Sequence, residues 1–227
     1  MSKIFDLDSP FMRVLNRIAD LMILNFLMLI CCIPIFTIGA ACTGMHYVLL
    51  KTVRGEEGYL VKGFFKSFKQ NFKQATIIWL LMLLVIGVYV GDFLIFSYSG
   101  VKFPTILMIA ILAIAIVFLM VAVYIFPVLS RFDNTVKNTI KNAFCMAVLN
   151  LPKTLLMILL LALPVVILYF SDYAAIFVIL FGISAPAYAS AYLYSGIFKK
   201  FEPEEQTIVS DEEFSVKTDE GNEENNG

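Results

Sequence analysis

The chain alternates between long apolar runs that carry almost no charge and short segments crowded with polar residues. A helix that crosses the hydrocarbon core of a bilayer needs about 20 predominantly apolar residues. Four runs approach or exceed this length: residues 75–96, 104–129, 154–170 and 174–197. Each predicts a transmembrane helix, and the predicted fold class is therefore all-α, a polytopic helical bundle.

The first apolar run, residues 21–50, is too long for one upright span and short for two. Ser9 and Pro10 predict the start of a helix, because serine caps a helix and proline fits its first position. Pro34 is expected to end that helix, and Thr37 is placed to cap a second one. We therefore expect six spans, with five as the alternative.

Positive charge predicts the orientation of these spans. Ten of the 17 Lys and Arg residues lie in two segments, residues 51–74 and 130–153. The segments expected on the opposite side carry Lys102 alone (97–104) or no Lys or Arg at all (171–174). Because cytoplasmic loops retain Lys and Arg whereas short translocated loops avoid them, the crowded segments are predicted to be cytoplasmic. Two lysines directly after the last span place the C-terminus in the cytoplasm, and six spans place the N-terminus there too.

With six spans the chain divides into three helical hairpins, each entered through an amphipathic cytoplasmic segment. In the clearest of these, residues 59–74, four lysines share one narrow stripe and four phenylalanines fill the neighbouring arc. The lysines are Lys62, Lys66, Lys69 and Lys73, and the phenylalanines are Phe64, Phe65, Phe68 and Phe72. Such a helix is expected to lie along the headgroups, with its ammonium groups on anionic lipid and its rings in the acyl boundary. A docking helix for a cytoplasmic partner is the alternative. The third hairpin begins with residues 133–150, which repeat this plan less cleanly.

Composition agrees with a membrane class, since 60% of the residues are hydrophobic and 15% are charged, against about 25% charged in a soluble domain. Acidic residues gather after residue 198. We therefore expect a membrane-embedded domain over 1–198 and an acidic, disordered cytoplasmic tail over 199–227. Nucleic acid is not expected as a partner, because anionic lipid accounts for the basic segments. A cleaved signal peptide is not expected either, since the region before the first apolar run is long.

The residues suggest no catalytic, cofactor or metal site, and the protein is not expected to be an enzyme. The single histidine, His46, follows Cys42 by four residues, but a closed zinc site would need two further ligands from elsewhere. A histidine that faces the membrane or packs within the bundle is the simpler interpretation. Ionisable groups inside spans usually mark a substrate or ion pathway. Asp92 is such a group, but it lies near the predicted outer end of its span, which weakens the case for a carrier.

Small residues predict close helix packing at two places. Gly87 and Gly91 form a GxxxG pair, and the last span carries further pairs of small residues such as Ala187 and Ala191. We expect both to pack within the bundle rather than to form a dimer seam, and the oligomeric state stays open. Tyr194 and two neighbouring tyrosines are expected either in an aromatic belt or in contact with a sugar.

Five short motifs within residues 1–198 are those of a known type of membrane protein. They are Asp8-Ser9-Pro10-Phe11 with Asn16-Arg17, Pro34 with Thr37-Ile38-Gly39-Ala40, Arg54-Gly55-Glu56-Glu57-Gly58, residues 64–75, and Pro127 with Arg131-Phe132-Asp133. In these residues the chain resembles the bacterial YesL family, integral membrane proteins of unknown molecular function. Their genes often neighbour carbohydrate ABC-transport genes in Firmicutes.

The resemblance implies an accessory or regulatory role in carbohydrate uptake, in a bacterial cytoplasmic membrane, with ABC transporter or sensor components as partners. It supplies no catalytic residues. The residues themselves leave open the alternative of a small carrier or channel for a neutral solute.

Overall fold

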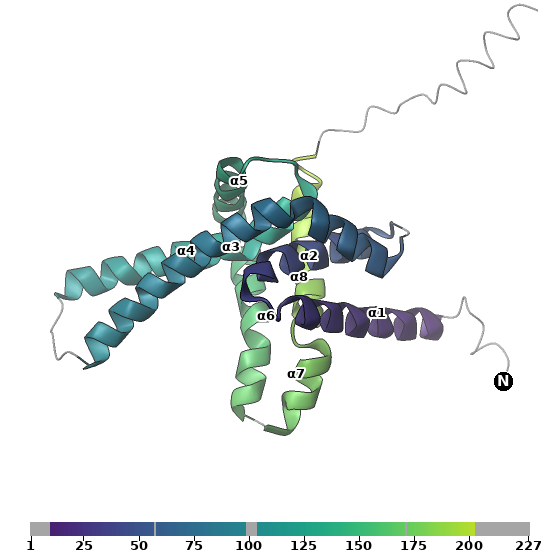
Figure 1. Ribbon diagram of the computed structural model, residues 1–227, viewed down its shortest axis with the longest axis horizontal. Helices are drawn as coiled ribbons and strands as arrows, with labels where there is room; N and C mark the ends of the chain where they lie inside the picture. The colour runs from purple at the N-terminus through teal and green to yellow at the C-terminus, as the bar shows by residue number, and fades with distance from the viewer. Residues whose placement is uncertain (1–9, 57, 99–103, 171, 203–227) are drawn as a thin grey trace, which may run out of the picture. The chain divides into compact units, whose positions relative to one another are not determined.

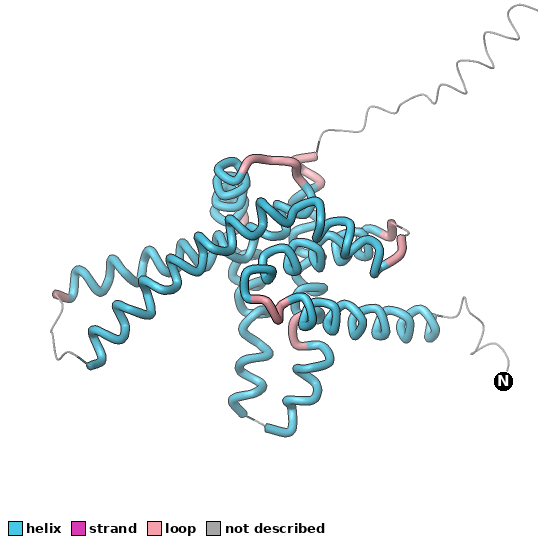
Figure 2. Tube along the Cα trace, viewed as in Figure 1, coloured by secondary structure: helices cyan, strands magenta, loops and turns pink. Residues whose placement is uncertain are grey.

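The computed structural model describes residues 10–56, 58–98, 104–170 and 172–202. Within these ranges all regular structure is helical and no strand occurs, which confirms the all-α class (Figure 2). The helices are α1 (Pro10–Cys31), α2 (Ile38–Arg54), α3 (Leu60–Tyr98), α4 (Thr105–Arg131), α5 (Val136–Leu149), α6 (Leu151–Phe170), α7 (Ala175–Phe181) and α8 (Ser184–Phe198), with short 3₁₀ turns at Ile35–Thr37 and Asp172–Ala174 (Figure 1).

Four helices, α1, α3, α4 and α6, are long and apolar enough to cross a membrane. Helices α7 and α8 meet at a bend of 49° and add a fifth candidate span if they are counted together. Many large apolar side chains of these helices point outward, as Ile106 and Leu155 do, and a bilayer favours such a surface. The protein is therefore a multi-pass membrane protein with four to five candidate spans.

The predicted six spans and their arrangement in three hairpins are not confirmed, because α2 is not among the candidate spans. Its start and end agree with the prediction, because Pro34 precedes it and Thr37 occupies its N-cap position. At 17 residues, however, α2 is shorter than the about 20 residues of a typical span. The hydroxyl of Thr37 does not cap α2 but donates to the carbonyl groups of Cys31 and Pro34, and so ties the end of α1 to the start of α2.

Helix α2 is packed against α3 more closely than side chains normally allow. A Cβ on Gly39 would lie 2.5 Å from the carbonyl oxygen of Ala75 and 2.8 Å from the Cβ of Trp79. A Cβ on Gly44 would lie 2.9 Å from the carbonyl oxygen of Phe64. Only glycine permits these approaches. The Trp79 indole also donates to the carbonyl oxygen of Ile35 at 2.7 Å, which fixes α3 to the turn before α2.

Helix α3 is one continuous helix of 39 residues. The sequence predicts an amphipathic segment (59–74) followed by a span (75–96), and the structure joins the two because no proline separates them. The corresponding segment before α6 stays separate as α5. Its N-terminus is capped by the Thr135 hydroxyl, which accepts from the N–H of Asn138, and Pro152 stands at the start of α6 as expected.

The small-residue predictions have different outcomes. Ala187 and Ala191 are fully buried, which agrees with packing inside the bundle. For Gly87 and Gly91 the prediction is wrong, because no described atom lies within 4 Å of a Cβ built at either position. Both glycines lie on a face of α3 that no other described helix contacts at these positions.

The chain divides into two units after Ile197, and the helices from α1 to α7, with α8 as far as Ile197, belong to the first. The sequence predicts that the acidic tail, residues 199–227, is disordered. Residues 203–227 lie outside those that the structure describes.

Candidate functional site

A basic pocket lies where α2 turns into α3. The last turns of α2, the connection that follows, and the first turns of α3 surround a volume of about 200 Å³. Its lining residues are Tyr47, Val48, Lys51, Gly58, Tyr59, Leu60, Lys62, Gly63 and Lys66. Three of these nine carry an ammonium group and none carries a carboxylate, so the basic pocket favours a negatively charged occupant.

The pocket forms because α2 ends abruptly at Gly55. This residue has a φ of +73°, in the left-handed region that glycine adopts without strain. Its N–H bonds back to the end of α2, and the N–H of Glu56 donates to the carbonyl oxygen of Lys51 at 3.0 Å. Such an ending reverses the chain, so that the last turns of α2 face the first turns of α3.

Tyrosine rings position two of the three ammonium groups. The Nζ of Lys51 lies 5.3 Å from the ring centroid of Tyr47, and that of Lys62 lies 4.7 Å from the ring centroid of Tyr59. Lys51 also contacts the Glu56 carboxylate at 3.7 Å, but this pair is partly exposed and contributes little to stability. The first backbone N–H groups of α3 add positive potential at the same place. Lysines around a helix N-terminus suit a phosphate or carboxylate group.

The predicted lysine stripe is exposed along its whole length, but it divides into two parts. Lys62 and Lys66 line the basic pocket, whereas Lys69 and Lys73 lie beyond it on α3. Sequence reasoning did not assign Lys51 or Tyr47 to this surface. The signal that could have indicated them is their spacing of four residues at the end of a helix, which places both on one face.

The predicted phenylalanine arc divides in a similar way. Phe65, Phe68 and Phe72 are partly exposed and form a row, with ring centroids 6.4 and 5.5 Å apart. Phe64 has no exposed surface, because its ring packs over Gly44 of α2. Phe64 therefore belongs to the protein core, and the prediction that it contacts lipid is wrong. Lipid contact by the other three rings stays a prediction.

A buried amide occupies the break between α7 and α8. Asn25 of α1 has no exposed surface, and its Nδ2 donates to the carbonyl oxygen of Ile179 at 2.7 Å. Its Oδ1 accepts from the N–H groups of Ile183 and Ser184 at 3.1 and 3.0 Å. Gly182 and Ile183 lie between the two helices, and any side chain at position 182 would collide with Val178. One side chain thus satisfies three backbone groups at the bend.

Helices α2 and α8 are joined by polar contacts. His46 Nδ1 lies 3.1 Å from the hydroxyl of Tyr194, and their rings meet edge to face. Arg54 Nε donates to the hydroxyl of Ser195 at 3.4 Å. His46 is therefore packed within the bundle, which is one of the two arrangements expected for it. Tyr194 is fully buried and does not belong to an aromatic belt.

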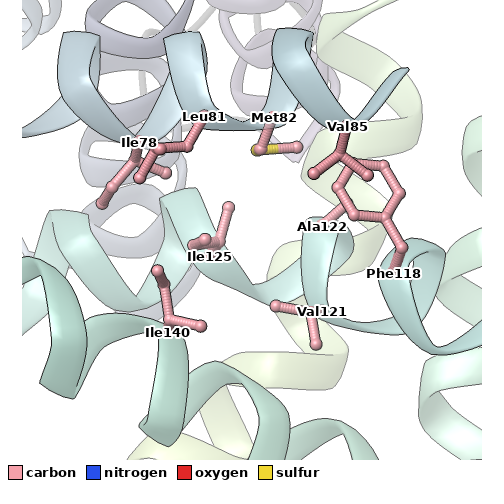
Figure 3. Close-up of a pocket in the computed structure, with 9 residues that line it drawn as sticks. All are labelled: Ile78, Leu81, Met82, Val85, Phe118, Val121, Ala122, Ile125 and Ile140. Carbon is pink, nitrogen blue, oxygen red and sulfur yellow. The ribbon is translucent and has the colours of Figure 1, made fainter. Parts of the chain in front are cut away.

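An apolar pocket of about 180 Å³ lies between α3, α4 and α5 (Figure 3). Its lining residues are Ile78, Leu81, Met82, Val85, Phe118, Val121, Ala122, Ile125 and Ile140. None of these side chains carries a polar group other than the thioether of Met82, so the pocket cannot orient a polar ligand. It suits a hydrocarbon chain and is not the candidate functional site.

Comparison with known proteins gives one match. Residues 21–93 match a family model described as "Protein of unknown function, DUF624". This segment runs from the middle of α1 through α2 and most of α3, and it contains both Asn25 and the basic pocket. No curated protein and no solved structure matches the chain. Over residues 21–93 the chain is therefore similar to a domain of unknown function that YesL-like membrane proteins carry.

Proposed function

We propose that the protein is a non-enzymatic accessory protein of the bacterial cytoplasmic membrane whose basic pocket binds the headgroup of an anionic lipid. The observation that carries this proposal is the convergence of Lys51, Lys62 and Lys66 on one cavity. Helix α2 leads from the pocket into apolar sequence, and α3 does so after Gln74, which supports a position of the pocket near the headgroups. Each lysine near an anionic surface contributes about 1 kcal/mol to binding.

The partner in this proposal is a component of carbohydrate uptake of the ABC type or its sensor. Its support is the resemblance of the motifs to the YesL family. Lys69 and Lys73 offer such a partner a charged surface that lies outside the basic pocket. Affinity purification from native membranes in a mild detergent is expected to recover a transporter or sensor component together with this protein. Recovery of the protein without any such component would argue against the partnership.

Neutralising the basic pocket is expected to remove bound anionic lipid. We expect the triple substitution Lys51→Gln, Lys62→Gln and Lys66→Gln to weaken binding of phosphatidylglycerol by about a hundredfold, because three lysines each contribute about 1 kcal/mol. Native mass spectrometry of the detergent-purified protein, titrated with phosphatidylglycerol or with phosphatidylcholine, measures the bound lipid.

The matched control is the double substitution Lys69→Gln and Lys73→Gln, which removes charge from the same helix but not from the pocket. We expect this variant to retain phosphatidylglycerol. An equal loss in both variants would show that lysines along the whole stripe bind lipid without a defined pocket. Full retention in the triple variant would contradict the proposal.

A small carrier or channel for a neutral solute is the second candidate function. The observation that favours it is the break between α7 and α8, since discontinuous helices line the substrate sites of many transport folds. Liposomes that contain only this protein are expected, on this hypothesis, to take up a neutral sugar faster than protein-free liposomes. Equal uptake by the two would reject it for that sugar.

A further inference from the structure

A second cavity lies between α3 and α4, near the C-terminal end of α3 and the N-terminal end of α4. Its volume is about 520 Å³, which falls in the range of small-molecule sites. Seven of its nine lining residues are apolar, and the other two are Tyr89 and Asp92. We call this cavity the α3–α4 groove.

The groove follows from the spacing of its residues along two neighbouring helices. On α3 they recur at positions 89, 92, 93 and 96, and this interval of three and four residues places them on one face. The α4 residues between 107 and 115 recur in the same manner. The two helices run beside each other in Figure 1, so these faces form opposite walls of the groove.

Asp92 is the one charged residue that lines this otherwise largely apolar groove. Its side chain is half-buried, and no ion pair with another described residue is found for it. A carboxylate in a membrane helix is costly unless it has a partner, and for that reason such a residue usually marks a binding site. The rings of Phe93 and Phe96 line the same wall, and aromatic faces attract cations as well as apolar surfaces.

We propose that the α3–α4 groove binds an amphiphilic organic cation, with the positive charge at the Asp92 carboxylate and the apolar body against the aromatic and aliphatic walls. Charge complementarity selects this occupant. A zwitterionic phospholipid fits less well, because its phosphate would need a cationic partner and the lining of the groove contains no Lys, Arg or His.

Tetraphenylphosphonium is the probe that tests this proposal, and tetraphenylborate is its control of the same shape and opposite charge. Equilibrium dialysis with the full-length protein in neutral detergent, corrected with protein-free micelles, measures binding. We expect saturable binding of one phosphonium per chain and no saturable binding of the borate. Asp92→Asn is expected to weaken phosphonium binding by about tenfold, because it removes a partly desolvated charge pair, whereas Asp92→Glu retains most of the affinity.

Two further variants separate the groove from general effects of charge and folding. Ala115→Phe keeps Asp92 but fills the groove, and we expect it to lower phosphonium affinity as well. Asp133→Asn removes an exposed acid outside the groove and is expected to leave the affinity unchanged. Equal binding of phosphonium and borate, unchanged affinity in Asp92→Asn, or an equal loss in Asp133→Asn would each overturn the proposal.

Lys102 lies outside the described residues and is the basic residue nearest to the groove in sequence. If the groove takes an external cation, Lys102→Gln is expected to leave phosphonium affinity within a factor of about two, since the two charges do not form a pair. A gain of about tenfold would show that the ammonium group of the chain itself occupies Asp92, and this result would overturn the proposal.

Discussion

Replacing Asn25 by leucine is expected to lower the free energy of unfolding by about 3 kcal/mol, because three backbone groups at the bend, one buried and two partly buried, lose their partner at once. Leucine has a similar size, so the change removes hydrogen bonds without opening a large cavity. Water cannot replace them in the interior of a membrane protein. A thermal denaturation series in mild detergent, followed by size-exclusion chromatography, measures the loss.

Asn16→Leu is the matched control, since Asn16 lies on the same helix with its side chain exposed. We expect this substitution to change stability by no more than about 0.5 kcal/mol. If Asn25→Leu were as stable as the unmodified protein, the bend between α7 and α8 would have to be stabilised without Asn25. The role assigned to that side chain would then be wrong.

Gly39→Ala is expected to destabilise the protein by about 1–3 kcal/mol, the range typical of overpacking in a well-packed core. The added methyl group would lie 2.5 Å from the carbonyl oxygen of Ala75, a backbone atom that cannot rotate away. Helices α2 and α3 must therefore separate. Trp79 is the only tryptophan of the chain and touches this contact, so its fluorescence emission reports the separation together with the thermal stability.

Gly87→Ala provides the comparison for this substitution. It makes the same chemical change on α3 at a position where no described atom lies within 4 Å of the new methyl group. Because alanine favours a helix more than glycine does, by about 1 kcal/mol in helix interiors, we expect stability to be unchanged or slightly higher. Equal losses at Gly39 and Gly87 would mean that the close approach of α2 and α3 does not determine stability.

Much of the helical pattern follows from the sequence, because proline and charge mark where helices begin and end. Pro10, Pro34 and Pro152 stand at helix boundaries in the structure as predicted. The bend after α7 was not predicted, because residues 174–197 carry no charge and are expected to form one span. Gly182 and Pro186 lie at this bend, and glycine and proline commonly mark the end and the start of a helix. Asn25, whose side chain stabilises the bend by hydrogen bonds, lies in a different helix more than 150 residues earlier in the chain.

Only part of the candidate site was predicted, because the rest of it is formed by contacts between helices that the sequence pattern does not reveal. Helical periodicity places Lys62 and Lys66 on one polar stripe of α3. It cannot show that Lys51 approaches them from α2, because that approach depends on a tertiary contact. The burial of Phe64 has the same origin, since it requires Gly44 of α2 to receive the ring.

The unbroken course of α3 has a mechanical consequence. At 1.5 Å per residue its 39 residues extend about 58 Å, nearly twice the about 30 Å of a hydrocarbon core. A stiff rod of this length behaves as a lever, and its tightest point of support is the contact between Gly39 and Ala75. When the apolar arm changes its tilt about this contact, the arm that carries Lys62 and Lys66 must swing in the opposite direction.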